Sequence, residues 1–208
     1  MRNALSTAIT SIASWLPAGG FDGAKRSAAR DCDCYHLGMD TTVALDLRIV
    51  PLSAELAQRI RRTLTDDFGN RLAVWHCDSP APCRSCLRLS QVGEPLIVFA
   101  HRPFDFDGPY AEVGPIFIHA DPCEPYADAR RFPPDFATRC LTMRGYNDRG
   151  TIQTAELSQP GEPEATLARL FADERVRFVH VRNPAWGCYD FAVERVAERT
   201  PRSAATSV

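Results

Sequence analysis

The chain has 208 residues, of which 45% are hydrophobic, enough to bury the core of one globular domain. Its 24 basic and 26 acidic residues give a formal net charge of −2, which disfavours a general binder of nucleic acid or of anionic membranes. No run of 18 apolar residues occurs, so the sequence predicts no membrane-spanning segment.

The two ends of the chain differ in composition from the part between them. Residues 1–38 are rich in Ala, Ser, Thr and Gly and lack the apolar periodicity of a core element. We therefore expect a disordered N-terminal extension at 1–38, a single folded domain at 39–197 and a disordered tail at 198–208. A secretory signal peptide is disfavoured, because five Ser and Thr residues interrupt its apolar stretch and no clear cleavage site follows.

The first predicted elements are a strand and a helix. Apolar and β-branched residues alternate over residues 41–50, which predicts a strand. Ser53 is the expected N-cap of a helix that ends at Gly69. The core-facing stripe of this helix is Leu56, Ile60 and Leu64. Its outer face carries three arginines that we expect to be solvated: Arg59, Arg61 and Arg62.

Strands dominate the rest of the chain. They are predicted at residues 71–75, 95–100, 114–120, 140–146, 177–181 and 189–196, and the second and third of these are apolar enough to be central. Pro163 stands at the start of a second helix, where proline is favoured. This order predicts an α+β fold with one domain, a mainly antiparallel sheet and about two helices packed on it.

Eight cysteines are unusual for a chain of this kind. A domain of this length has core enough to fold without disulfides, and several cysteines stand near histidines. We therefore expect mostly reduced thiols and a cytoplasmic location.

Several short strings, taken together in their order and spacing, resemble a bacterial family known only as domain of unknown function 1203. They are Pro82-Cys83-Arg84, Gly93-Glu94-Pro95-Leu96, Pro109-Tyr110, Gly114-Pro115-Ile116-Phe117-Ile118-His119, Arg144-Gly145-Tyr146 and Gly187-Cys188-Tyr189. The likeness extends from Leu47 to Arg195. It implies a small soluble bacterial protein, and it implies no activity or catalytic residue.

A metal site is the sharpest functional prediction. Cys83-x-x-Cys86 supplies two thiolates from one tight turn, and His119-x-x-x-Cys123 follows an apolar strand. If the two pairs converge, they offer the four ligands that zinc requires. Only the first pair has the standard spacing, so the alternative is that these cysteines are small, half-buried hydrophobic residues.

A cysteine nucleophile is the competing prediction. Cys83 stands beside Arg84, whose charge would stabilise a thiolate, and Cys188 follows Gly187 at the start of a strand. His180, on the preceding strand, would approach Cys188 across the hairpin as a catalytic base. Without such a contact, Cys188 is a core residue.

An anion site is the third prediction. Arginines next to strand ends or turns form forks that bind carboxylate or phosphate. The candidates are Arg84, Arg102, Arg144 and Arg182, with Tyr110 and Tyr146 completing a polar pocket. The alternative is that each arginine pairs with a nearby acid: Glu112, Asp105 or Asp107.

Three functions stay open from the sequence. The first is a soluble protein that binds zinc or a small anion through a pocket of Cys, His and Arg residues. The second is an enzyme with a cysteine nucleophile that acts on a small substrate. The third is a protein-interaction module whose surface aromatic residues would be Trp75, Phe104, Phe106 and Tyr110. A small-molecule anion is the expected ligand, no nucleic-acid or membrane partner is expected, and the sequence leaves the oligomeric state open.

Overall fold

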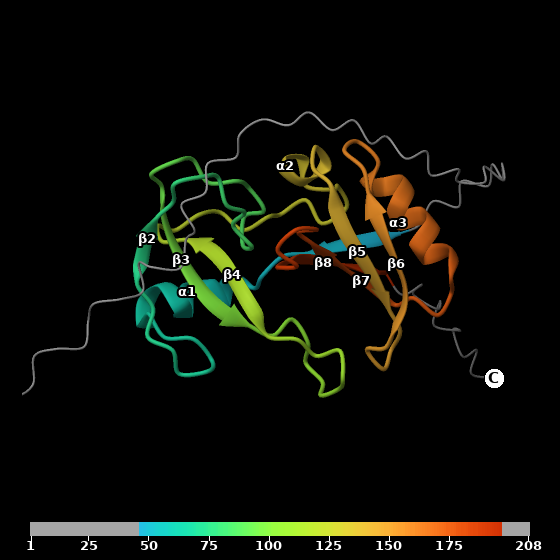
Figure 1. The fold of residues 1–208 in the computed structure, drawn as a ribbon, viewed down its shortest axis with the longest axis horizontal. Coiled ribbons are helices and arrows are strands. Elements are labelled where there is room, and N and C mark those ends of the chain that lie inside the picture. The colour runs from blue at the N-terminus through green and yellow to red at the C-terminus, as the bar shows by residue number, and fades with distance from the viewer. Residues whose placement is uncertain (1–45, 197–208) are drawn as a thin grey trace, which may run out of the picture. The chain divides into compact units, whose positions relative to one another are not determined.

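A computed structural model of the chain describes residues 46–196, which form two antiparallel sheets and three helices (Figure 1). The expected extension at 1–38 and tail at 198–208 lie outside the described residues, as does the first part of the strand expected at 41–50. No helix within residues 46–196 has the length and apolar character needed to cross a membrane.

The larger sheet has five strands in the order β1-β8-β7-β5-β6. Their bounds are β1 Leu47–Val50, β8 Tyr189–Arg195, β7 Phe178–Arg182, β5 Leu141–Tyr146 and β6 Ile152–Ser158. Helix α3, Pro163–Ala172, lies along β5 and β6 and buries Leu167, Leu170 and Phe171 against this sheet (Figure 1). The opposite face of β7 carries His180 and Arg182, because side chains alternate along a strand.

The smaller sheet has three strands in the order β2-β3-β4. They are β2 Val74–His76, β3 Pro95–His101 and β4 Gly114–His119, and helix α1, Ala54–Thr63, lies near them (Figure 1). Ala57 and Ile60 of α1 are fully buried in a second apolar cluster with Ile97, Ile116 and Ile118. The nearly continuous apolar runs in β3 and β4 are therefore explained by their place at the centre of this cluster.

The predicted start of the first helix is confirmed, and its predicted end is wrong. The Ser53 hydroxyl accepts a hydrogen bond from the Leu56 amide (3.1 Å), as an N-cap does. The helix stops at Thr63 because Leu64 takes a left-handed conformation (φ 44°) and its amide donates to Ile60. The Asp66 carboxylate then holds a turn by accepting from the amides of Phe68 and Asn70, and Gly69 belongs to that turn.

Two elements were not predicted from the sequence. Strand β6 has polar residues at four of its seven positions, and it is one of the two edge strands of its sheet. Helix α2, Pro134–Ala137, is a single turn that buries Phe136. The predicted α+β fold, mainly antiparallel with about two helices, is confirmed; its strands divide into two sheets, and the single-turn α2 is a third helix.

Candidate metal centre

The Cys83-x-x-Cys86 segment forms a tight turn that is fixed to strand β4. The amide of Leu87 donates to the carbonyl oxygen of Cys83 (3.0 Å), and Leu87 itself has a positive φ of 53°. The amide of Arg84 donates to the carbonyl oxygen of Phe117 on β4 (2.9 Å). The two cysteines are thereby held beside the strand that ends in His119.

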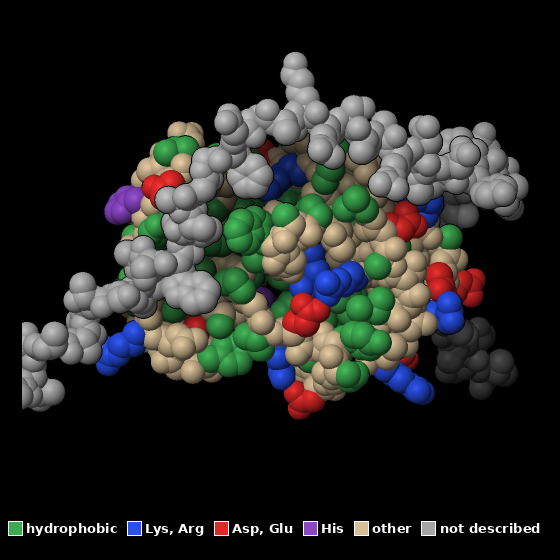
Figure 2. Space-filling model, viewed as in Figure 1, with side chains coloured by type: hydrophobic (Ala, Val, Ile, Leu, Met, Phe, Trp, Pro, Cys, Tyr) green, Lys and Arg blue, Asp and Glu red, His purple; other side chains and the backbone are tan. Residues whose placement is uncertain are grey.

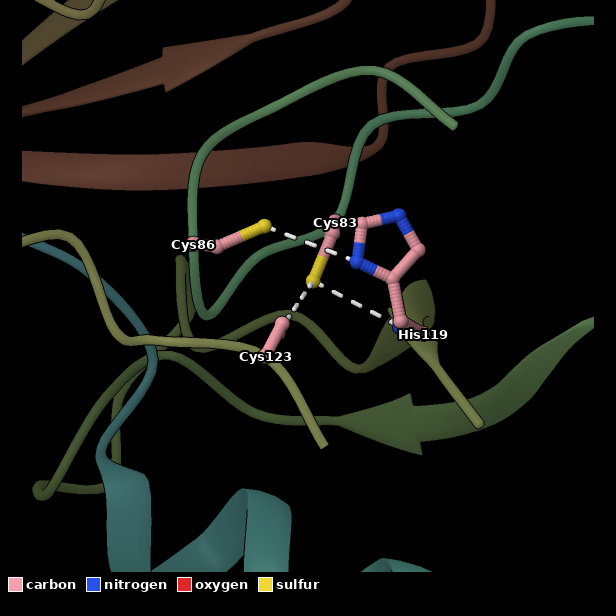
Figure 3. A group of neighbouring side chains, drawn as sticks. All are labelled: Cys83, Cys86, His119 and Cys123. Carbon is pink, nitrogen blue, oxygen red and sulfur yellow. Dashed lines mark hydrogen bonds between the residues drawn. The ribbon is translucent and has the colours of Figure 1, made fainter. Parts of the chain in front are cut away.

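The structure brings together the four residues predicted as metal ligands. One ligand atom from each of Cys83, Cys86, His119 and Cys123 lies within 4.8 Å of the other three. The Sγ atoms of Cys83 and Cys123 are 3.9 Å apart, and Sγ of Cys86 is 3.5 Å from Nδ1 of His119. Figure 3 shows these side chains converging from the turn, from the end of β4 and from the loop that follows it. Around a tetrahedral zinc ion, neighbouring ligand atoms lie about 3.6–3.8 Å apart.

Burial differs among the four ligands. Cys83, Cys86 and His119 expose 0%, 3% and 5% of their surface, whereas Cys123 is half-buried. Cys123 lines a cleft of about 590 Å³, together with Arg61 and other residues. Three ligands are therefore sealed inside the protein, and one is reached from solvent.

A second layer of residues contacts the ligands. Arg61 donates to the Cys123 sulfur (3.2 Å) and to the carbonyl oxygen of His119 (3.0 Å). The Nε2 atom of His119 is buried without a hydrogen-bond partner, and a carboxylate oxygen of Glu94 lies 3.7 Å from it. A histidine that binds metal through one nitrogen commonly presents the other to a carboxylate.

The three thiols influence one another's ionisation. The pKa of Cys83 falls to about 2, chiefly because the Cys123 thiol donates a hydrogen bond to its sulfur. The pKa of Cys86 is also lowered, first through Cys123. The pKa of Cys123 is raised, chiefly because its thiol donates these hydrogen bonds to Cys83 and Cys86 and would lose them on deprotonation, and also because a third negative charge would then stand beside the other two sulfurs. A divalent cation at the centre would offset that repulsion and favour three thiolates.

Arg84, predicted for a thiolate or an anion, instead lies in a buried ion pair. Its Nη2 atom is 3.0 Å from a carboxylate oxygen of Asp190, and the two side chains expose 1% and 3% of their surface. It also donates to the carbonyl oxygens of Tyr189 (2.8 Å) and Pro82 (2.6 Å). Burial raises the pKa of Asp190 to about 6, against the opposing effect of Arg84. The pair joins the cysteine turn to strand β8.

The other arginines predicted for an anion also have acidic partners. Glu112 accepts from Arg144 (2.5 Å) and from Arg182 (2.8 Å), and Arg102 pairs with Asp107 (2.7 Å). On the face shown in Figure 2, basic and acidic side chains lie next to one another at several points. The pairing alternative therefore describes these arginines.

The remaining anion candidates are two tyrosines. Tyr146 is buried and stacked on Phe178, with ring centroids 5.1 Å apart. Tyr110 is 37% exposed on the loop before β4. The two tyrosines thus occupy different surroundings, one in the interior and one at the surface.

Cys188 and His180 are not joined by a hydrogen bond in the described part of the chain. The Cys188 thiol contacts the carbonyl oxygen of Trp186 (3.9 Å). His180 is surrounded by aromatic rings, and the centroid of the Phe104 ring lies 4.6 Å from that of the imidazole. Phe104 is 6% exposed, so it packs inside the protein, whereas Trp75 is 42% exposed. The predicted aromatic surface is therefore divided between the interior and the exterior.

Sequence reasoning missed three residues around the centre. Arg61 was expected to be solvated, yet it contacts two of the ligands. Glu94 and Asp190 were not singled out. In the pairing of β3 with β4, Leu96 lies opposite His119, and this register brings Glu94, two residues before Leu96, near the imidazole.

No curated protein and no solved structure matches this chain at a significant level. A family model described as protein of unknown function (DUF1203) matches residues 80–195, a span that includes all four converging side chains. Because the match covers more than half of the sequence, the chain belongs to the DUF1203 family.

Proposed function

We propose that the protein binds one Zn²⁺ through Cys83, Cys86, His119 and Cys123, and that the ion has a structural role. The observation that carries this proposal is the convergence of three sulfurs and one imidazole nitrogen within 4.8 Å of one another. Tetrahedral sets of thiolates with one imidazole are typical of zinc, since hard cations such as Mg²⁺ and Ca²⁺ prefer oxygen ligands.

Charge supports the same ion. Three thiolates around Zn²⁺ leave a net charge of −1, which nearby cations can balance. Arg61 donates to the Cys123 sulfur. The pKa of Arg88 is raised above its usual value, chiefly by interaction with the Cys86 sulfur.

A structural role is favoured over a catalytic one, because catalytic zinc keeps one coordination position for water or substrate. Here all four positions would be filled by side chains, three of them buried. The turn that holds the site also lies between the two apolar clusters: Cys83 and Cys86 belong to the cluster of the smaller sheet, and Leu87 belongs to that of the larger one. The ion would therefore fasten the two sheets together.

The other functions predicted from the sequence have weaker support. The arginines suggested for anion binding have acidic partners, and no hydrogen bond within residues 46–196 links His180 to Cys188. All six described cysteines are free thiols, and thiolate ligands persist best in a reducing compartment. We accordingly place the protein in the cytoplasm.

Metal analysis tests the proposal directly. Full-length protein reconstituted with Zn²⁺ and dialysed should retain about one zinc per chain, and the Co²⁺ form should show the intense visible absorption of tetrahedral cobalt with thiolate-to-metal charge transfer. Cys86→Ser should abolish retention, and Cys140→Ser, at an exposed cysteine outside the cluster, should leave it unchanged. Wild-type protein that retains no zinc, or equal retention by Cys86→Ser, would refute the proposal.

A further inference from the structure

A second cavity lies away from the cysteine cluster, and none of the four proposed ligands lines it. It has a volume of about 560 Å³ and is bounded by the start of α1, the loop after β3 and the strands β7 and β8. Cavities of this size are typical of small-molecule sites. Six aromatic or imidazole side chains line it: His101, Phe104, Phe106, Phe178, His180 and Tyr189.

Three of these side chains have unused hydrogen-bonding groups. His180 is 2% exposed, and its Nδ1 atom has no hydrogen-bond partner. Within residues 46–196, no hydrogen bond forms to the imidazole of His101 or to the hydroxyl of Tyr189. The Tyr189 ring stands near both imidazoles, with its centroid 5.0 Å from that of His180 and 5.9 Å from that of His101. Because buried polar groups are normally paired, the unpaired Nδ1 of His180 indicates a ligand, and the half-buried imidazole of His101 and hydroxyl of Tyr189 are placed to bind the same ligand.

The inner surface of the cavity carries no histidine charge at neutral pH. Burial lowers the pKa of His180 to about 3 and that of His101 to about 4. Burial also raises the pKa of Tyr189, which therefore stays a phenol. Each imidazole can both donate and accept one hydrogen bond, and the phenol can do the same.

The unpaired charges at the cavity are negative. Asp105 and Asp148 line it and form no ion pair within the described residues. The two other charged lining residues have partners: Arg102 pairs with Asp107, and Glu194 pairs with Arg48. The faces of the aromatic rings are also electronegative, so both features attract a cation.

We propose that this cavity binds a small organic cation, an amine that carries an aromatic ring. The ring would pack among Phe104, Phe178 and Tyr189, as ring pairs in proteins do. The protonated amine would be drawn towards Asp105 and Asp148, and the neutral imidazole of His180 would accept a hydrogen bond from the ligand. A carboxylate in the same position would be repelled by the two aspartates, and the arginine of the lining, Arg102, already pairs with Asp107.

Three probes that share one ring and differ in charge test this proposal: tryptamine, tryptophol and indole-3-acetate. Titration of the zinc-reconstituted full-length protein, followed by calorimetry and by NMR of the imidazole protons, should show saturable binding of tryptamine. Its affinity should exceed that of indole-3-acetate by about tenfold or more, with uncharged tryptophol between them. No saturable binding of tryptamine, or equal binding of indole-3-acetate, would overturn the proposal.

Two substitutions locate the bound probe. Asp148→Asn should weaken tryptamine binding severalfold and leave tryptophol unchanged, because it removes charge and little volume. Tyr189→Phe, which preserves the ring, should weaken binding of both probes. Asp78→Asn, at an exposed acid outside the cavity, is the matched control and should have no effect. Thermal melting of each variant shows whether it is folded, and identical affinities in Asp148→Asn and wild type would place the probe elsewhere.

Discussion

The five-stranded and the three-stranded sheet bury clusters of different size and composition. The cluster of the larger sheet has 14 buried residues, none of them a cysteine, and α3 covers it. The cluster of the smaller sheet has nine, two of which are Cys83 and Cys86. Apolar burial stabilises a sheet roughly in proportion to the area removed from water. The comparison therefore predicts that the larger sheet is stable through its own packing and that the smaller one depends on the metal centre.

The cysteine turn lies where the two regions meet. Cys86 packs in the cluster of the smaller sheet, and the next residue, Leu87, packs in the cluster of the larger sheet. On the same turn, Arg84 pairs with Asp190 of β8. Two kinds of interaction thus join the regions at one place, and each can be removed separately.

Removal of the metal is expected to have the largest effect. If free zinc exceeds its dissociation constant about ten-thousand-fold, binding contributes about 5 kcal/mol to the free energy of unfolding. A chelator should therefore lower the melting temperature and increase hydrogen exchange first in β3 and β4. Exchange in β7 and β8 should change less, because these strands pack in the larger cluster.

The control is the same treatment of the Cys86→Ser variant, which should melt like the chelated wild type and should not respond further. Uniform loss of protection in both sheets would show that they unfold as one unit and would contradict the proposed difference between them.

The substitution Asp190→Asn is expected to have the next largest effect on stability. It leaves the Arg84 guanidinium buried with carbonyl acceptors but without a counter-charge. Breaking a buried pair in this way should cost about 3 kcal/mol, measured by urea unfolding at pH 7. Asp107→Asn removes the partner of Arg102 from a pair that is far more exposed, and it should change stability by less than about 1 kcal/mol.

The sequence allowed prediction wherever the signal was local. The apolar runs predicted two central strands, which is right for β3, whereas β4 lies at the edge of its sheet and owes its apolar run to burial in the cluster with α1. The spacing of Cys83 and Cys86 indicated a turn with two thiols side by side, and these thiols lie in the cluster of four possible ligands. Pairings between distant residues carried no such signal. Arg84 and Asp190 are separated by more than 100 positions, and the residues next to either one do not indicate that the other is its partner. The cavity could not be predicted for the same reason. His101 and His180 belong to different sheets, and only the packing of the chain brings both to the cavity.

The burial of His180 on β7 predicts an effect of intermediate size on the pH dependence of the free energy of unfolding. The folded-state pKa of His180 is about 3, and the unfolded value is near 6.5. Above pH 6.5 neither state binds this proton; below it, the unfolded state binds the proton and the folded state does not. Stability should therefore fall by about 2 kcal/mol between pH 6.5 and pH 5 from this residue alone.

The test is the difference between wild type and His180→Gln, since other groups titrate in both proteins. The free energy of unfolding of the variant should depend less steeply on pH over this interval. The difference in slope should correspond to about one proton bound on unfolding. His76→Gln, at an exposed histidine of β2, should keep the wild-type slope. Parallel curves for wild type and His180→Gln would mean that the imidazole accepts its proton in the folded state.

The smallest predicted effect concerns α1, which packs on the smaller sheet through Ala57 and Ile60. Ser53→Ala removes the hydroxyl that accepts from the Leu56 amide, and loss of an N-cap of this kind costs about 1 kcal/mol. Since the helix contributes to the cluster that holds Cys83, the loss should be concentrated in the smaller sheet and should add to the effect of chelation. Ser53→Asp, which restores a capping acceptor and places a negative charge at the helix start, should recover the stability. Equal protection of α1 amides in Ser53→Ala and wild type, measured by hydrogen exchange, would show that packing alone holds the helix.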